Sequence, residues 1–267
     1  MSFELGPALL FCPADRPERF AGALAKADAV ILDLEDAVLP EAKAKARANL
    51  LAAELDPSRV IVRVNDPASA HFGDDLEAVA RTPFRTVMVA KTEDPATLDA
   101  FGEEYALLAL CETAAGVLRA PEIAAHPRVV ALMWGAEDLV ASIGGTASRF
   151  ADGGYRDIAR HARSRVLFAA AAHGRAAIDA VHLDIDDAAG LAQEAADAAA
   201  SGFRATACIH PKQVPTIREA YRPDAATLDW ARVVLAAAEG ERGVFRFEGR
   251  MVDEPVLRHA RAVLARA

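Results

Sequence analysis

The stretch Ala29-Val30-Ile31-Leu32-Asp33-Leu34-Glu35-Asp36 contains the pattern that decides the fold: a short apolar run ends at residues capable of chemistry. The pattern recurs, and we interpret eight such runs as strands, at residues 8–12, 28–34, 59–64, 85–90, 106–111, 128–134, 178–183 and 204–209. Nearly continuous apolar runs are typical of parallel strands that are covered on both faces. Helical patterns fill most of the gaps between them. This alternation predicts an α/β fold, a single (β/α)8 TIM barrel with its active site at the C-terminal strand ends.

The length of 267 residues fits one barrel with little left over. We assign residues 1–222 to the catalytic barrel and residues 223–267 to a C-terminal helical extension, or lid, of the same domain. Helices are expected at about 225–239 and from Glu254 onward. The longest gap between predicted strands, between the sixth and the seventh, is expected to form an elaborated loop near the barrel mouth.

Composition narrows the class of protein. A net charge of -9 and a pI near 5.3 argue against a nucleic-acid partner, which would require a basic stripe. The chain has no apolar run long enough for a membrane span and no signal-like N-terminus, so a cytoplasmic location is expected. Its three cysteines form no CxxC motif, and we interpret them as buried thiols in a reducing compartment.

Every predicted strand runs into a residue that could serve a reaction, which indicates an enzyme. These residues are, in chain order, Asp15-Arg16, Asp33-Leu34-Glu35-Asp36, Arg63, Lys91, Glu112, Gly135 with Asp138, Asp184 and His210. An anionic substrate would need local positive charge in this acidic protein, and Arg16, Arg19, Arg63 and Lys91 could supply it.

The first candidate pair is Glu112 and Asp138, which end the neighbouring fifth and sixth predicted strands. Two carboxylates together with waters and a bidentate oxygen ligand make a typical Mg2+ site. Two alternatives stay open on spacing alone. Both acids could be solvated helix N-caps, and Glu137 could replace Asp138 as the ligand.

Arg63 lies inside an apolar strand run, where a charge is costly to bury unless it is paired. Its planar fork suits a substrate carboxylate or a developing enolate oxygen. Barrel acids such as Glu35 or Asp36 could equally satisfy it, and both roles can hold together. We count Glu35 and Asp36 with Arg63 among the catalytic candidates, as support for Arg63 and for metal-bound waters.

Several other chemistries lack their signatures. No HxH or HExxH spacing supports zinc, and no GxSxG supports a serine hydrolase. Gly144-Gly145 lacks the spacing of a phosphate-binding loop.

With these residues in place, the sequence resembles the citrate lyase β-subunit-like family of CoA-ester lyases, relatives of malyl-CoA lyase. The similarity covers almost the whole chain in order. Its segments are Leu10-Phe11-Cys12-Pro13, Arg16-Pro17-Glu18-Arg19, Asp33-Leu34-Glu35-Asp36-Ala37-Val38, Val62-Arg63-Val64-Asn65, Lys91, Glu112-Thr113, Trp134-Gly135-Ala136-Glu137-Asp138-Leu139 and Ile209-His210-Pro211-Lys212-Gln213.

The resemblance implies a barrel that assembles as a homotrimer or a dimer of trimers. It implies that Glu112 and Asp138 hold Mg2+, that Arg63 binds the oxo- or hydroxy-acid portion, and that Arg16 and Lys91 meet CoA. Relatives carry a Glu-Gly-Lys-Met-Val segment like residues 248–252 here. The acid of that segment reaches a neighbouring subunit's site as a lid, which implies an acid/base role in trans for Asp253. The other interpretation is that Asp253 only caps a helix.

The expected reaction is reversible, Mg2+-dependent cleavage of a β-hydroxyacyl-CoA, of the type that converts citryl-CoA into acetyl-CoA and oxaloacetate. Malyl-CoA hydrolysis, or condensation with hydrolysis as in malate synthase, is the alternative on the same site. A third hypothesis of another class is a non-catalytic subunit of a larger complex. Whether an acyl-carrier partner exists is left open.

Overall fold

A computed structural model describes residues 3–241 and 243–266. The chain divides into two compact units, Met1–Ile217 and Arg218–Ala267. The first unit holds the barrel, and the second holds the last helices and a small hairpin.

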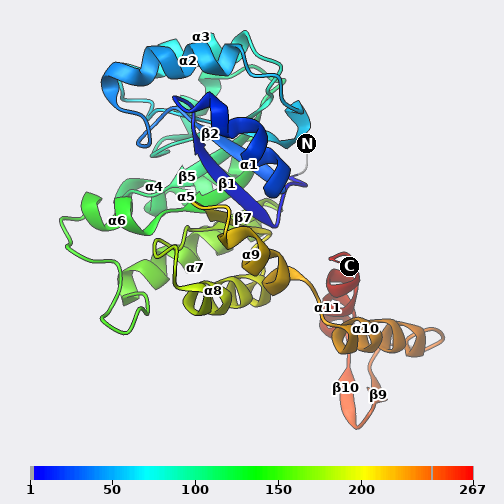
Figure 1. Cartoon of the computed structure of the whole chain (residues 1–267). Coiled ribbons are helices and arrows are strands. Elements are labelled where there is room, and N and C mark those ends of the chain that lie inside the picture. Colours follow the sequence, from blue (N-terminus) through cyan, green and yellow to red (C-terminus); the bar gives the residue numbers. More distant parts are fainter. Residues whose placement is uncertain (1–2, 242, 267) are drawn as a thin grey trace. The chain divides into compact units, whose positions relative to one another are not determined.

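The first unit is a closed barrel of eight strands in sequence order, in which each strand pairs in parallel with the next and β1 closes against β8 (Figure 1). This arrangement confirms the predicted TIM barrel. Its strands are β1 (Ala8–Pro13), β2 (Ala29–Asp33), β3 (Val60–Val64), β4 (Thr86–Val89), β5 (Ala106–Cys111), β6 (Val129–Trp134), β7 (Ala176–Asp179) and β8 (Ala205–Cys208).

Helices connect the strands. Four short 3-10 turns also occur, and each has proline in its first turn, where a backbone N–H would have no partner within the helix. The helices are α1 (Phe20–Lys26), α2 (Lys43–Leu51), α3 (Phe72–Ala80), α4 (Ala114–Leu118), α5 (Ala120–Ala125), α6 (Ala136–Ser142), α7 (Asp157–Ala172), α8 (Ala188–Ser201) and α9 (Gln213–Tyr221). The 3-10 turns are η1 (Pro17–Arg19), η2 (Pro40–Ala42), η3 (Pro57–Arg59) and η4 (Pro95–Ala100). Over the described residues, no helix is long and apolar enough to cross a membrane.

In β2 and β3 the inner face changes from apolar to charged along the strand, and residues two apart share that face. Ile31 and Ile61 belong to the buried apolar cluster inside the barrel. Two residues further along, Asp33 and Arg63 line the pocket above that cluster, and they are direct register partners of β2 and β3. The strand pattern therefore delivers opposite charges to one level at the barrel mouth.

The seventh strand corrects the prediction. It spans Ala176–Asp179 rather than 178–183, so Asp184 does not end a strand and lies instead in an exposed turn. Asp179 can be buried inside the run because Trp134 Nε1 donates to it at 2.6 Å and Arg163 pairs with it at 2.9 Å. Leu183, which continues the apolar run, is 50% exposed and outside the core.

The second unit packs α10 (Ala225–Ala237) and α11 (Glu254–Leu264) around their own apolar cluster. Between them, β9 (Phe245–Phe247) and β10 (Arg250–Val252) form an antiparallel hairpin. Its two-residue turn, Glu248-Gly249, has positive φ at both positions, as tight hairpin turns require. Asp253 is the N-cap of α11 and accepts from the N–H of Val256 at 3.4 Å.

Candidate active site

A cavity of about 180 Å³ opens at the C-terminal ends of the barrel strands. It is lined by apolar residues and by the charged residues at the ends of β2 and β3 and just after β5 and β6. The residues that line it include Phe11, Asp33, Arg63, Leu110, Glu112, Met133, Gly135, Glu137, Asp138, Ala180, Val181 and Ile209. A cavity of this kind, apolar with a few convergent polar groups, is the expected place for a small ligand.

Arg63 is held by a two-point contact with Asp33. Its Nε and Nη2 donate to the two oxygens of that carboxylate at 2.7 and 2.6 Å, and both side chains are buried. Nη1 lies 2.9 Å from Glu35 Oε2, and the guanidinium carbon sits 4.8 Å above the ring of Phe11. Burial alone would lower the pKa of Arg63, but the carboxylates of Asp33, Glu35 and Glu112 together raise it. Arg63 is therefore a fixed cation beside the cavity.

These contacts decide between the two acids that were expected to pair with Arg63. Glu35 does so, whereas Asp36 contacts Lys91 instead. The main partner is Asp33, because the register of β2 against β3 sets it directly opposite Arg63.

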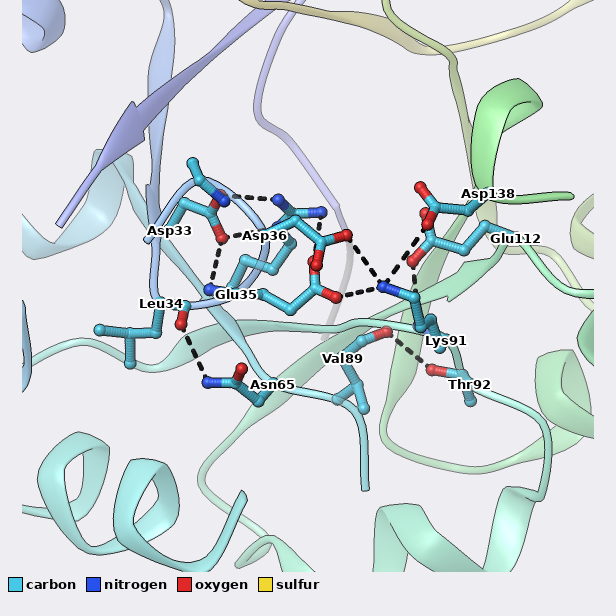
Figure 2. Close-up of polar contacts among 12 residues, drawn as sticks. Asp33, Leu34, Glu35, Asp36, Asn65, Val89, Lys91, Thr92, Glu112 and Asp138 are labelled. Carbon is cyan, nitrogen blue, oxygen red and sulfur yellow. Dashed lines mark hydrogen bonds and ion pairs between the residues drawn. The ribbon is translucent and has the colours of Figure 1, made fainter. Parts of the chain in front are cut away.

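Lys91 links the two sides of the site (Figure 2). Its Nζ contacts Glu35, lies 3.0 Å from Asp36 Oδ2 and reaches to 3.5 Å from Asp138 Oδ1. Its backbone, at a left-handed φ of 47°, directs its N–H to Glu112 Oε1 at 3.1 Å. Burial acts to lower the pKa of Lys91, and its hydrogen bonds to Glu35 and Asp36 more than compensate and raise it.

Glu112 is 3% exposed at the end of β5, so the alternative of a solvated helix cap is wrong for this residue. Thr113 is the cap of α4, and its hydroxyl accepts from Gly116 N at 3.1 Å. Burial, and then the nearby charge of Asp138, raise the pKa of Glu112 to about 8. Gly135 makes room for it, since a Cβ there would lie 2.8 Å from Glu112 Oε2.

The carboxyl pair of Glu112 and Asp138 fits a hard divalent cation. The raised pKa of Glu112 means that its ionised form needs more positive charge than the protein supplies nearby. Among residues 3–241 and 243–266, no three His, Cys, Asp or Glu side chains are grouped to hold a metal ion. Mg2+ tolerates that scarcity because it keeps waters and takes one or two carboxylates. The carboxylate of Glu137 accepts from Ser148 Oγ at 2.6 Å, which favours Asp138 as the second ligand.

Of the predicted site residues, Arg63, Glu112 and Asp138 line the cavity, and Glu35, Asp36 and Lys91 join them through ion pairs. Arg16 lies on the loop after β1 with its side chain 52% exposed, and it pairs with Asp15 at 3.7 Å. Asp253 belongs to the second unit, where it caps α11.

The sequence reasoning passed over Lys43, which lies in α2 with 6% exposure. Its ammonium donates to the carbonyls of Leu34 and Glu35 and to Asn65 Oδ1. A signal was available, because Lys43 shares a helix face with Ala46 and Leu50, both buried.

Comparison with known proteins places these residues in a wider context. A family model described as HpcH/HpaI aldolase/citrate lyase matches residues 8–211. A citrate lyase subunit beta-like protein of Mycobacterium tuberculosis (strain ATCC 25618 / H37Rv) is 56% identical over 262 residues, covering 98% of this chain and 96% of the relative. The mitochondrial citramalyl-CoA lyase of Homo sapiens is 31% identical over 265 residues, covering 87% of this chain and 76% of the relative.

Among solved structures, the chain is similar to protein CitE from Mycobacterium tuberculosis in complex with magnesium, acetoacetate and coenzyme A. The TM-score is 0.93 at 56% identity, with 98% of each chain covered. The fold of the chain thus has a close structural counterpart.

Proposed function

The chain belongs to the HpcH/HpaI aldolase/citrate lyase family, an enzyme family of carbon–carbon lyases, and from this premise we propose that it cleaves a β-hydroxyacyl-CoA reversibly with the help of Mg2+. One observation carries the proposal: a single small cavity joins a fixed guanidinium, Arg63, to the carboxyl pair of Glu112 and Asp138. Citryl-CoA going to acetyl-CoA and oxaloacetate is the type of reaction that we expect.

Glu112 and Asp138 would hold the metal ion. The proposal is supported by the cavity charge described above and by a similar protein crystallised with magnesium, acetoacetate and coenzyme A. When bound, Mg2+ supplies a Lewis acid for the carboxylate and hydroxyl oxygens of the substrate acid. Gly135 leaves space for the Glu112 carboxylate at the proposed metal site, because a side chain at position 135 would overlap that carboxylate.

Arg63 serves the acyl fragment. As the carbon–carbon bond breaks, the substrate hydroxyl gives up its proton, its oxygen forms the carbonyl of the keto acid, and the electron pair of the broken bond passes to the acyl-CoA fragment as a thioester enolate. The enolate carbon then takes up a proton from the acid/base residue, which balances the proton released by the hydroxyl. A fixed guanidinium at the cavity wall stabilises that developing charge, and Asp33 and Glu35 hold it in place. Lys91 and Arg16 lie on loops after β4 and β1, and we assign them to the anionic groups of CoA.

Asp253 is proposed as the acid/base that exchanges the α-proton of the acetyl-CoA fragment, acting from the neighbouring subunit. This role requires a homo-oligomer, which we propose is a trimer or a hexamer. We also propose that the protein is cytoplasmic. The test is complementation between Asp253→Asn and Arg63→Ala. Each variant alone should be nearly inactive, and mixed oligomers should regain activity. No recovery in demonstrably mixed oligomers would reject the role.

The reaction is tested with a panel of CoA thioesters assayed with Mg2+ and with EDTA, following keto acid and free thiol separately. Cleavage predicts keto acid without free CoA, and loss of the keto acid signal in EDTA. Free CoA would instead indicate the thioesterase or synthase alternative on the same site. An inert protein across the panel would favour a non-catalytic subunit, and acyl-carrier proteins would then be the partners to examine.

A further inference from the structure

Asp33 holds the turn that follows β2, residues 34–37, through hydrogen bonds to its backbone. That carboxylate accepts from the N–H of Glu35 at 2.9 Å and from the N–H of Ala37 at 3.3 Å, in addition to its two bonds with Arg63. The backbone of the turn is thus wound around the same group that fixes Arg63.

Lys43 of α2 holds the same turn through hydrogen bonds from its side chain. Its Nζ donates to Leu34 O at 2.9 Å, to Glu35 O at 3.0 Å and to Asn65 Oδ1 at 2.8 Å. These three bonds use all three ammonium protons. Burying an ammonium group against neutral oxygens costs free energy. This cost would be unnecessary if the only role of Lys43 were to stabilise the fold by holding two carbonyls.

Asn65 connects this ammonium to a second buried charge. Its Nδ2 donates to Leu34 O at 2.9 Å and to Asp75 Oδ2 at 2.6 Å, and its N–H donates to Asp75 Oδ2 at 2.9 Å. Asp75 is fully buried in α3 and pairs with Arg47 of α2 at 3.0 Å. The turn is therefore anchored to two helices behind it (Figure 2 includes the Asn65–Leu34 bond).

We propose that Lys43 is a positioning residue for the active site: by fixing the Leu34 and Glu35 carbonyls, it sets the carboxylate of Glu35, which in turn holds both Arg63 and Lys91. Glu35 contacts Nη1 of Arg63 at 2.9 Å and also contacts Lys91. Releasing its backbone would loosen both cations at once. The inference rests on the proposed function, since it assigns a geometric role within that same site.

Lys43→Met tests the proposal, with Lys45→Met as its matched control, because Lys45 lies on the same helix and is exposed. The probes are Mn2+ alone, followed by electron paramagnetic resonance, and pyruvate in the presence of Mg2+, followed by calorimetry. Lys43→Met should weaken pyruvate binding about tenfold and lower turnover about 10–100-fold, while the Mn2+ affinity changes by less than about threefold. Lys45→Met should match the wild type in all three.

A merely structural role would lower Mn2+ affinity and melting temperature together with pyruvate affinity, and that result would overturn the proposal. Should Lys43→Met fail to fold, Asn65→Ala removes one ammonium contact and should give the same split with a smaller effect. Wild-type protein that binds Mn2+ and pyruvate while Lys43→Met and Asn65→Ala match the control would reject this inference alone. Wild-type protein that binds neither probe would reject the proposed function as well.

Discussion

The two halves of the barrel mouth treat their acids differently. After β2, the carboxylates of Asp33, Glu35 and Asp36 each contact a cation, Arg63 or Lys91. After β5 and β6 the contacts with cations are looser. Glu112 accepts from the backbone N–H of Lys91 at 3.1 Å and lies within reach of the charge of Arg63, and Asp138 Oδ1 lies 3.5 Å from Lys91 Nζ.

The difference appears in how firmly charge is neutralised. In the β2–β4 half, burial acts to raise the pKa of Asp36, but the hydrogen bond and charge of Lys91, together with Glu35 and Arg63, lower it overall. Burial raises the pKa of Glu35, with Arg63 and Lys91 opposing it. In the β5–β6 half, burial and Asp138 raise the pKa of Glu112 to about 8. One half is thus preorganised by its own ion pairs, and the other needs a cation from solution.

The largest effect should come from removing charge in the β5–β6 half. Glu112→Gln keeps the shape of the side chain but loses a metal ligand, so turnover should fall by about 1000-fold or more, beyond the 10–100-fold typical of outer partners. Asp138→Asn should behave alike. Steady-state kinetics with a thermal melt as the folding control would check this, and near wild-type turnover in either variant would refute the ligand assignment.

A smaller but still severe effect is expected from Arg63→Lys in the other half. The charge survives, but the two-point contact with Asp33 and the fixed position beside the cavity do not. Turnover should fall about 100-fold, the scale of one lost charge-stabilising donor. Since loss of packing on Phe11 could mimic this, Phe11→Leu should be melted and assayed in parallel. Unaltered catalytic efficiency in Arg63→Lys would contradict the role.

The pH dependence of the metal-free protein should also separate the halves. Burial and the charge of Asp138 raise the pKa of Glu112 from its ordinary value of 4.5 to about 8, so between these pH values the folded state holds a proton that the unfolded state releases. Its contribution to stability is therefore full below about pH 4.5 and is lost as pH rises toward about 8. Melts in EDTA should show this loss, and Glu112→Gln should remove it. A wild-type pH profile identical to that of Glu112→Gln would disprove the raised pKa of Glu112.

The smallest effect is expected at the rim of the paired half. The carboxylate of Asp36 is 60% exposed, and its bond to Lys91 is solvated on one side. Asp36→Asn should change stability by less than about 1 kcal/mol and turnover by only a few-fold. Urea unfolding and kinetics would measure both. A loss as large as that of Arg63→Lys would mean that Asp36 acts directly on the substrate.

The sequence predicts the barrel because eight apolar runs end at polar or charged residues and alternate with helical patterns. It places the seventh strand too late because the apolar run continues through Leu183, whereas the strand ends at Asp179, which is held by Trp134 and Arg163, distant in sequence. Similarly, it could name Arg63 but not its main partner Asp33, since strand register decides which acid lies opposite.

Lys43 could not be assigned a role from the sequence, because its three acceptors come from the β2 turn and the end of β3. Asp253 is the opposite case, because its role is implied by the resemblance and not by its contacts. The structure describes it as a helix cap in the second unit, and its expected role in trans stays a prediction that only mixed oligomers can test.

The central claim, that the β5–β6 half binds the metal while the β2–β4 half neutralises itself, is tested most directly by Mn2+ titration of Glu112→Gln against Glu35→Gln. Both variants make the same chemical change at a buried acid, one in each half. Glu112→Gln should weaken Mn2+ binding by more than about 100-fold, and Glu35→Gln should stay within about threefold of the wild type. Equal losses in the two variants, or a loss confined to Glu35→Gln, would contradict the account.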